Sequence, residues 1–300
     1  GIQIVTNETG EIGYRVYVGG GLGRTPYLAL EIGAFVPKAD ILAFLEAVMR
    51  VYNESGRRDN IHKARVKILV HQIGIEEMRK RVEREFDEIK KTGTLLLPED
   101  EIARIARYFA PPAFDALSDD PPEFTNARDA NKDFAAWVKT NVDPHKQPGH
   151  AIATISLKEI GATPGDCSSD QMDALADLMD EFGQPEIRVT HEQNLVLPHM
   201  RQRDLFALWQ KLVPLGLASA THGLVTDIIA CPGLDYCDLA NARSIPVAQA
   251  IAQRFADPAR QQDLGELKIK ISGCINACGH HHIGHIGILG VDRKGVENYQ

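Results

Sequence analysis

The sequence has no long apolar run, no excess of positive charge, and no basic segment followed by an apolar one near its first residue. A membrane-spanning helix needs about 18 or more consecutive apolar residues, so we predict no such helix. The formal net charge is −8, whereas a dedicated nucleic-acid-binding protein would be basic overall. The absence of a basic segment followed by an apolar one near the first residue also argues against a secretory signal peptide.

Cysteine is scarce as well. The five cysteines among 300 residues do not form the dense set of a secreted disulfide framework. We therefore expect reduced thiols and a cytoplasmic protein. The hydrophobic share of 44% and the charged share of 25% are those of an ordinary soluble globular chain. This length is enough for two or three domains.

Four of the five cysteines form two pairs. Five residues separate Cys231 from Cys237, and three separate Cys274 from Cys278. Two thiolate pairs are what an iron–sulfur cluster or a zinc ion needs. Structural zinc sites favour about two to four residues between paired cysteines, so the wider first gap favours a cluster. Zinc remains an alternative, as does a set of buried, unreactive thiols. Cys167 belongs to neither pair.

Small and turn-forming residues surround both pairs, namely Pro232, Gly233, Gly273 and Gly279. Such residues let backbone N–H groups approach sulfur, and these hydrogen bonds help set the reduction potential of a cluster. Both pairs follow predicted strands, over residues 225–230 and 267–272, and a helix is predicted over residues 238–255. Loops at strand ends are free to wrap a cofactor.

Four histidines follow the second cysteine pair, at His280, His281, His282 and His285. Adjacent side chains in such a run point in different directions. We therefore interpret them as a hydrogen-bonding, basic rim around an anion site, with zinc ligation as the alternative.

A glycine-rich loop, residues 19–23, follows a predicted hairpin over residues 1–18 that turns at residues 8–10. Clustered glycines permit close backbone approaches, and the N–H groups of such a loop can hold an anionic ligand. The loop matches neither the dinucleotide-binding nor the phosphate-loop pattern. A tight structural turn is therefore the alternative to a ligand contact.

Residues 57–67 carry five cations, Arg57, Arg58, Lys63, Arg65 and Lys67. They can form a solvated face or a patch that holds an anionic cofactor or substrate. The alternation of apolar residues over positions 64–68 suggests a strand, which would place Arg65 and Lys67 on one face. In a helix these two side chains would point about 200° apart. Arginine can clamp an oxyanion in a bidentate manner, whereas lysine is a mobile charge and a possible proton donor.

The remaining elements follow from periodicity and composition. Apolar residues at helical spacing predict a core helix over residues 39–55, a charged helix over 75–91 and a short helix over 99–109. The Pro-, Asp- and Asn-rich residues 93–148 predict a long connecting arm with short helical turns, which Phe134 and Trp137 pin to a domain surface. Residues 149–217 alternate strand, helix, strand, helix, over 151–157, 169–182, 187–197 and 205–215, which indicates half of an α+β sandwich.

The two ends of the chain resemble each other. Residues 1–5 and 13–18 can be laid beside residues 287–291 and 295–300, with a polar turn between the segments in each copy. We interpret this as an internal duplication and the chain as a piece of a longer protein. Chance similarity of two short hairpins is the alternative.

Several of these motifs together resemble one family. The two cysteine pairs, the glycine loop with Arg24-Thr25-Pro26, the basic segment and the motif Arg188-x-Thr190-x-x-Gln193-Asn194 are similar to the siroheme and [4Fe–4S] hemoproteins that reduce sulfite or nitrite in assimilation. The resemblance spans essentially the whole chain. It implies an α+β fold with pseudo-twofold architecture, in which siroheme-type α/β domains combine with ferredoxin-like half-domains.

The resemblance also implies domain boundaries. Residues 1–110 would be a first siroheme-type domain, 111–148 a linker arm, 149–217 a ferredoxin-like half-domain, and 218–300 a second, truncated siroheme-type domain with the cysteines. The motif over residues 188–194 lies in the second copy of the half-domain. Its counterpart in the first copy is the one expected to touch siroheme, so this motif receives no site role.

The family further implies the ligands of the cofactors. Cys231, Cys237, Cys274 and Cys278 would hold the [4Fe–4S] cluster, and the Cys278 sulfur would bridge to the siroheme iron. The resemblance extends the cofactor contacts to Gly19, Gly20, Gly21 and Asn276.

The implied reaction is the six-electron reduction of sulfite to sulfide, with electrons from ferredoxin or a flavoprotein reductase. Arg65 and Lys67 match the family's basic pair beside the substrate. We expect Arg65 to bind the oxyanion and Lys67 to deliver protons. The alternatives are nitrite reduction to ammonia with the same cofactors, a zinc-stabilised domain without catalysis, and an electron carrier that has a cluster but no haem.

Overall fold

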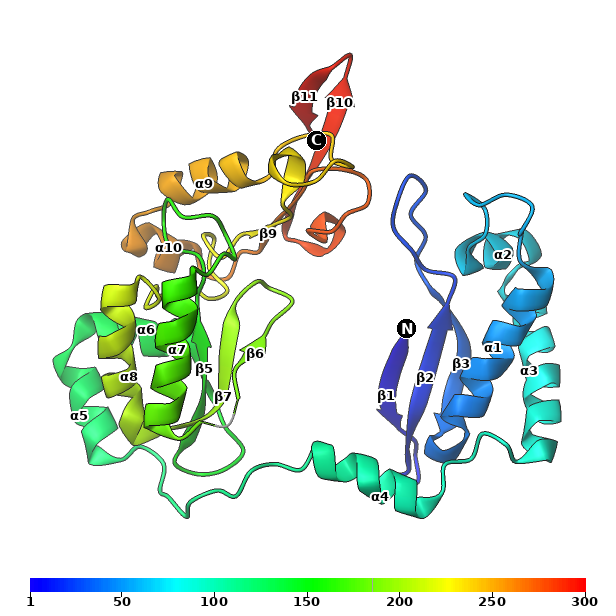
Figure 1. Cartoon of the computed structure of the whole chain (residues 1–300), viewed down its shortest axis with the longest axis horizontal. Coiled ribbons are helices and arrows are strands. Elements are labelled where there is room, and N and C mark those ends of the chain that lie inside the picture. Colours follow the sequence, from blue (N-terminus) through cyan, green and yellow to red (C-terminus); the bar gives the residue numbers. More distant parts are fainter. Residues whose placement is uncertain (185) are drawn as a thin grey trace. The chain divides into compact units, whose positions relative to one another are not determined.

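The computed structural model describes residues 1–184 and 186–300, which divide into two units, Gly1–Pro111 and Pro112–Gln300 (Figure 1). Each unit mixes helices with sheets, in agreement with the predicted α+β class. Within the described ranges, no helix is long and apolar enough to cross a bilayer.

The first unit is a three-stranded antiparallel sheet with helices packed on it. Its strands lie in the order β1-β2-β3. The elements are β1 (Ile2–Thr6), β2 (Ile12–Val18), β3 (Leu30–Pro37), α1 (Ile41–Ser55), α2 (Val66–Ile73), α3 (Ile75–Thr92) and α4 (Glu99–Tyr108). The core forms where the inner faces of β2, β3, α1 and α3 meet, and its buried residues include Val16, Ile32, Phe44, Val48, Met78 and Val82.

Local signals explain several boundaries in this unit. The β1–β2 turn closes on Asn7, whose side-chain oxygen accepts from the N–H groups of Thr9 and Glu11. Helix α3 ends at Gly93, which adopts the left-handed conformation with φ 65°. Sequence periodicity anticipated α1, α3 and α4 to within two residues, whereas strand β3 was not predicted.

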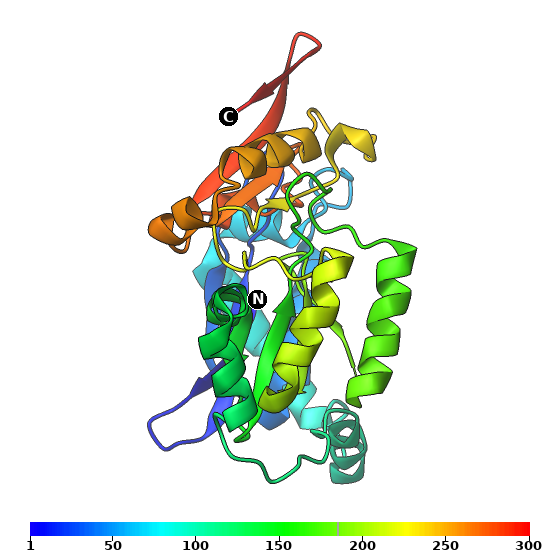
Figure 2. The ribbon, with the colours of Figure 1, turned by 90° about the vertical axis from the view of Figure 1, so that its left-hand side faces the viewer.

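The second unit begins with a four-stranded antiparallel sheet in the order β4-β5-β7-β6. Its elements are α5 (Pro122–Ala130), α6 (Lys132–Asn141), β4 (Val142–Pro144), β5 (His150–Ile155), α7 (Ser169–Phe182), β6 (Arg188–Val189), β7 (Leu195–Arg201) and α8 (Leu205–Leu212). Helices cover one face of the sheet (Figure 2). Helix α7 has the predicted bounds because Ser168 and Gln171 form a capping box at its start.

The structure corrects the connecting arm predicted over residues 111–148. Helices α5 and α6 and strand β4 occupy most of that stretch, and Phe124, Phe134 and Trp137 are buried in the same core as β5, α7, β7 and α8. The Pro121-Pro122 pair that suggested an extended arm instead begins a helix, because proline suits the first helical position. Among residues 111–148, only residues 111–121, 131 and 145–148 have neither helix nor strand.

The rest of the second unit is a separate four-stranded sheet in the order β11-β10-β9-β8. Its elements are β8 (Ile229–Ala230), α9 (Ile245–Arg254), α10 (Pro258–Leu264), β9 (Ile269–Ser272), β10 (Ile286–Arg293) and β11 (Val296–Tyr299). Strands β8, β9 and β10 are parallel, and β11 returns antiparallel to β10. Both copies of the predicted repeat, β1–β2 and β10–β11, are therefore antiparallel hairpins.

The helix predicted over residues 238–255 is shorter than expected. It begins at Ile245 and is followed by α10, which was not predicted. Residues 238–244 form a loop instead, and the N–H groups of Asn241 and Ala242 in that loop donate to Gly273 O. Pro246 lies in the first turn of α9, where its missing N–H costs nothing.

The placement of Phe134 in the core generates a first prediction. Replacing Phe134 by Ala should lower the free energy of unfolding of the second unit by about 3–5 kcal/mol, since it removes a fully buried aromatic ring. Urea unfolding followed by tryptophan fluorescence measures this, because both tryptophans, Trp137 and Trp209, lie near the Phe134 ring.

Phe109→Ala is the matched control, because the Phe109 side chain is 81% exposed. It should change the unfolding free energy by less than about 0.5 kcal/mol. Equal effects of the two substitutions would mean that residues 122–141 behave as a surface arm after all.

Candidate metal centre

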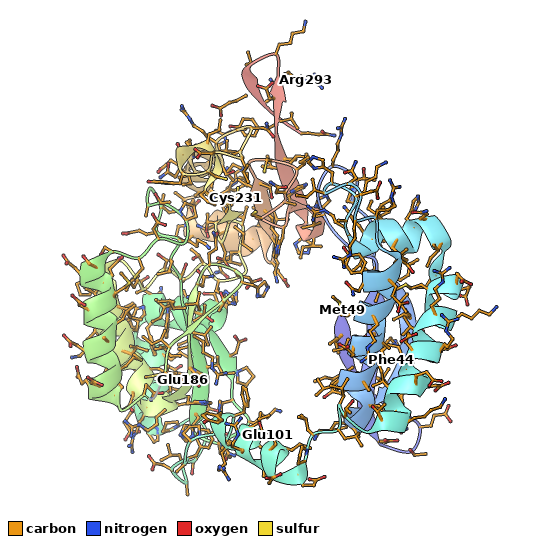
Figure 3. All side chains as sticks on the ribbon, turned by 45° about the vertical axis from the view of Figure 1, so that its right-hand side comes forward. Phe44, Met49, Glu101, Glu186, Cys231 and Arg293 are labelled. Atoms are coloured by element: carbon orange, nitrogen blue, oxygen red, sulfur yellow. The ribbon has the colours of Figure 1, made fainter. Side chains whose placement is uncertain are left out.

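Parallel pairing of β8 with β9 brings the two cysteine pairs together. The carboxyl ends of parallel strands meet at the same edge of a sheet. Cys231 follows β8 directly, and its N–H donates to Ile271 O of β9 over 3.1 Å. Cys274 lies two positions after the end of β9. Cys231 is labelled at this position in Figure 3.

Hydrogen bonds join the two cysteine loops. The N–H of Gly273 donates to the Cys231 sulfur over 3.1 Å, and the Ser244 hydroxyl lies 3.3 Å from the same sulfur. The carbonyl of Gly273 accepts from the N–H groups of Asn241 and Ala242. The predicted approach of backbone N–H to sulfur is therefore present at Cys231.

Three glycines are needed for this close packing. A Cβ atom on Gly273 would lie 2.6 Å from Ala242 O, and one on Gly279 would lie 2.0 Å from Ile271 O. Gly233 has a positive φ of 59°, and a Cβ there would lie 2.6 Å from Ser244 N. These contacts leave no room for any side chain, so the glycines around the cysteines are required by the fold of the loops.

The four paired thiols differ in exposure. Cys231 and Cys274 are buried, Cys237 is partly buried and Cys278 is exposed. Burial, and then the charges of Cys231, Cys274 and Cys237, raise the pKa of the Cys278 thiol. Cys167 packs instead against the core of the β4–β7 sheet.

The donor set by itself suits either metal. Four thiolates can hold a tetrahedral zinc ion or a [4Fe–4S] cluster. The five-residue gap between Cys231 and Cys237 is what favours the cluster.

A second group of metal-binding residue types lies nearby. Ligand atoms of Glu192, His222 and Asp227 are within 4.8 Å of one another. Two lysines already balance the carboxylates: Lys158 Nζ lies 3.7 Å from Asp227, and Lys268 Nζ lies 3.4 Å from Glu192. A divalent cation would be repelled by these ammonium groups. This group is therefore a charge network.

The histidines after Cys278 do not form a uniform basic rim. His281 is buried, and burial followed by its neighbour His282 lowers its pKa, which favours the neutral ring. His285 Nδ1 accepts the N–H of Lys268 over 2.9 Å. His281 therefore does not add positive charge near neutral pH, and His285 has a local structural contact.

The glycine loop folds as a compact turn within the first unit. Gly21 and Tyr27 exchange two backbone hydrogen bonds of 3.0 Å each. Gly19 and Gly20 pack so closely on Val70 and Ala29 that added Cβ atoms would lie 2.9 and 2.8 Å from them. The Gly21 N–H is thus already paired. Cofactor contacts by these glycines remain a prediction.

The strand predicted over residues 64–68 is wrong. Arg65 is extended, with φ −141° and ψ 142°, but it is the N-cap of helix α2. The helix forms because Val66, Leu69, Val70 and Ile73 follow helical spacing and pack on the core of the first unit. This pattern outweighs the short alternation of apolar residues that suggested a strand.

Arg65 and Lys67 consequently have different surroundings. Lys67 Nζ donates to Leu22 O and Thr25 O over 2.7 and 2.8 Å, so it closes the turn of the glycine loop. The Arg65 side chain is exposed, and no hydrogen bond or ion pair holds its guanidinium among the described residues. Asn276, predicted to contact siroheme, is also exposed. Arg65 is available for an anion, whereas the Lys67 ammonium keeps one free N–H.

Sequence reasoning gave no role to the motif over residues 188–194. In the structure, the side chains of Gln193 and Asn194 are bonded to Ala230 and Asp227, on the segment that leads to Cys231. A local sign of this role is the positive φ of Gln193, 59°, which is uncommon for a residue other than glycine. It is visible only in the structure.

Two family models match the chain. Residues 1–90 match the model described as nitrite and sulphite reductase 4Fe-4S domain. Residues 157–215 match the nitrite/sulfite reductase ferredoxin-like half domain. The first match covers most of the first unit, and the second covers the segment from the end of β5 to the end of α8.

Whole-chain comparisons agree with these matches. The chloroplastic ferredoxin–nitrite reductase of Zea mays is 27% identical over 290 residues, which are 94% of this chain and 44% of that protein. Sulfite reductase (ferredoxin) 2 of Mycolicibacterium paratuberculosis is 28% identical over 308 residues, 97% of this chain and 48% of that protein. The chain therefore spans about half the length of the curated relatives it matches.

A solved structure shows the same architecture. The NirA protein of Mycobacterium tuberculosis superposes with a TM-score of 0.68 and 26% sequence identity, over 99% of this chain and 48% of that one. Together with the family models, this match confirms the resemblance and the fold class predicted from the motifs.

The charge network around Asp227 generates a second prediction. Burial opposes ionisation of Asp227, but His222, Lys158, the Gly223 N–H and Asn194 outweigh it and lower its pKa below the ordinary 3.8. Replacing Asp227 by Asn leaves the buried Lys158 uncompensated. The free energy of unfolding of the second unit should then fall by about 3 kcal/mol, measured by urea unfolding at pH 5.5.

The pH dependence of this loss has a defined sign. Because the pKa of Asp227 is lowered, its contribution to the free energy of unfolding is present above the ordinary pKa. That contribution disappears as the pH falls through the folded-state pKa of Asp227. Asp227 also raises the pKa of His222 above 6.5. The stabilisation from protonated His222 is therefore present at low pH and disappears as the pH rises through the raised pKa of His222. The difference between wild type and Asp227→Asn should therefore be smaller at pH 8 than at pH 5.5. Asp173→Asn, on the exposed side of α7, is the control, and an equal loss there would contradict the prediction.

Proposed function

Because the chain belongs to the nitrite and sulfite reductase family, we propose that it carries the cluster-binding part of a siroheme-dependent reductase that converts sulfite to sulfide. One observation carries the proposal. The two loops that carry the four cysteines of the sequence motif begin at the adjacent ends of β8 and β9, and their glycines admit no side chain. Relatives named as sulfite and nitrite reductases support the same reaction class.

The thiols suit a [4Fe–4S] cluster in number, in sequence spacing and in hydrogen bonding. Cys231, Cys237, Cys274 and Cys278 are its proposed ligands. The Gly273 N–H bond to the Cys231 sulfur is of the kind that stabilises the reduced, more negative state of a cluster. Burial of Cys231 and Cys274 shields that side of the site from water.

Cys278 is the ligand suited to a second role. It is the exposed member of the four, so its sulfur would be open to a second metal if it held the cluster. Siroheme, when bound there, would supply an iron that holds the oxyanion while the oxyanion receives electrons. Asn276, in the same loop and also exposed, and the glycines Gly19, Gly20 and Gly21 are its other proposed contacts.

The basic residues supply charge and protons. Removal of oxygen from sulfite requires a cation to hold the anion and acids to protonate the departing oxygens. The Arg65 guanidinium, which no group among the described residues holds, suits anion binding, because its planar N–H groups match an oxyanion in a bidentate manner. Lys67 is held by two carbonyl groups, which orients its remaining N–H for proton delivery.

Nitrite is the second candidate substrate, because a nitrite reductase is among the relatives and the same groups would serve it. The relatives' names specify ferredoxin. We infer a one-electron donor of that class, with a flavoprotein reductase as the alternative. Turnover of sulfite and of nitrite by the full-length protein, with each donor, would separate these possibilities.

The cluster assignment generates a third prediction. In the full-length protein, purified without oxygen, Cys278→Ser should abolish the visible and electron paramagnetic resonance signals of an iron–sulfur cluster coupled to siroheme. Reductase activity should fall at least about 10³-fold, because electrons can no longer pass between the two groups. Spectra, iron analysis and a sulfite reduction assay measure these effects.

Cys167→Ser provides the control, since Cys167 packs against a different core. It should leave iron content, spectra and activity at wild-type values. Bound zinc in place of iron in the wild type would refute the reductase and favour the non-catalytic alternative. A cluster without siroheme would favour the electron carrier.

The proposed roles of the basic pair generate a fourth prediction. Arg65→Gln should lower kcat/KM for sulfite by about 10²-fold, mainly by raising KM, because a charged contact to the anion is lost. Lys67→Met should lower kcat by about 10²-fold or more, because a proton donor is lost. Optical spectra of both variants should retain the cofactor bands.

Lys63→Gln is the matched control, since Lys63 is an exposed cation of the same basic segment. Its kinetic constants should stay within about twofold of wild type. If all three substitutions lower activity equally, the effect comes from net charge, and the specific roles of Arg65 and Lys67 would be rejected.

A further inference from the structure

Strand β8, which delivers Cys231, has one unpaired edge in its own sheet. It consists of two residues, pairs with β9 on one side and ends the strand order. Backbone groups of successive residues in a strand point to opposite sides. Because the Cys231 N–H points to Ile271 of β9, the N–H and C=O of Ala230 point away from β9. Ala230 is buried, so these two groups need partners other than water.

The side chain of Gln193 supplies both partners. Its Nε2 donates to Ala230 O over 2.8 Å, and its Oε1 accepts the Ala230 N–H over 3.1 Å. One carboxamide thus takes the place of a neighbouring strand at this edge. Glutamine suits the position, because its amide presents a donor and an acceptor side by side.

The backbone of Gln193 is held in an unusual conformation. Its φ of 59° lies in the left-handed region, which costs free energy for a residue other than glycine. A Cβ on Gly165 would lie 2.8 Å from the Cβ of Gln193, so Gly165 leaves room for the glutamine stem. Surrounding contacts must therefore maintain this conformation.

Those contacts come from buried polar groups. Lys158 Nζ, whose side chain is 1% exposed, donates to Glu192 O and Gln193 O over 2.8 and 3.2 Å. Asn194 accepts the Leu157 N–H and donates to Asp227 Oδ1. The turn between β6 and β7 is thereby tied both to its own sheet and to the segment that precedes β8.

We propose that Gln193 is a positioning residue for Cys231, and through it for the metal centre. The inference rests on the proposed function, because it takes Cys231 to be a cluster ligand. The amide fixes Ala230, and Ala230 is bonded directly to Cys231. Without the side-chain amide of Gln193, the end of β8 can move relative to β9. The Cys231 sulfur then shifts relative to the Gly273 N–H that donates to it. The motif over residues 188–194 then serves the metal centre without touching it.

The test uses Gln193→Met in the full-length protein, because methionine keeps the length of the side chain but cannot form either hydrogen bond. Amide hydrogen exchange of Ala230 should become at least about tenfold faster, since its N–H loses its partner. The g values of the reduced cluster and its midpoint potential should both move, while the iron content stays at the wild-type value.

Gln193→Glu is the second variant. It keeps an oxygen that accepts the Ala230 N–H but has no N–H to donate to Ala230 O, so its exchange rate and spectra should lie between those of wild type and Gln193→Met. The control is Gln210→Ala, an exposed glutamine of α8 for which the described residues provide no side-chain hydrogen bond. It should match wild type in every measurement.

Each outcome decides the inference. Faster Ala230 exchange with unchanged g values and potential would show that Gln193 only stabilises the fold, and the positioning role would be rejected. Unchanged exchange would reject the Gln193–Ala230 contact itself. A wild-type protein without iron would overturn the proposed function, and the role toward a cluster with it, whereas the exchange measurement would still report whether Gln193 secures β8.

Discussion

The parallel pairing of β8 with β9 is the contact on which the metal centre depends. It places the first residues of two loops side by side although Cys231 and Gly273 are 42 positions apart in sequence. The hydrogen bond from the Cys231 N–H to Ile271 O sets the register of β8 against β9. The hydrogen bond from the Gly273 N–H to the Cys231 sulfur adds a second link between the two loops. A slip of one residue would turn the Cys231 side chain to the opposite face of the sheet. The glycines at 273 and 279 are required because the loops pack directly on these strands.

Two lysines show how this protein uses buried or half-buried ammonium groups. Lys158 holds the carbonyls of Glu192 and Gln193, and Lys67 holds those of Leu22 and Thr25. In both cases one flexible cation donates to two carbonyl groups and so closes a turn. Burial of Lys158 is costly by itself, and the nearby Asp227 and the two carbonyls offset that cost. A lysine near a site can therefore shape the backbone as well as move protons.

Local sequence signals succeeded where one residue type has one physical use. The helix predicted over residues 169–182 is α7, and in the structure a capping box at Ser168 and the left-handed Gly183 fix its two ends. The strand predicted over residues 64–68 failed because three apolar alternations are a weak signal, and the burial of Leu69 and Val70 selected a helix. The arm predicted over residues 111–148 failed because its prolines were taken as breakers. Phe134 and Trp137 are core residues whose burial depends on distant strands.

The sequence by itself determined which chemistry is available. It showed four paired thiols, glycines beside them, a basic segment and a repeated hairpin, because residue types and short spacings are written directly in the chain. Only the tertiary structure decided that Cys278 is the exposed member of the four paired thiols and that Gln193 completes the edge of β8. It also decided that Lys67 is held by two carbonyls, whereas the Arg65 guanidinium has no partner among the described residues. These properties depend on which distant segments pack together. Strand pairing and burial establish that packing, and no local pattern contains it.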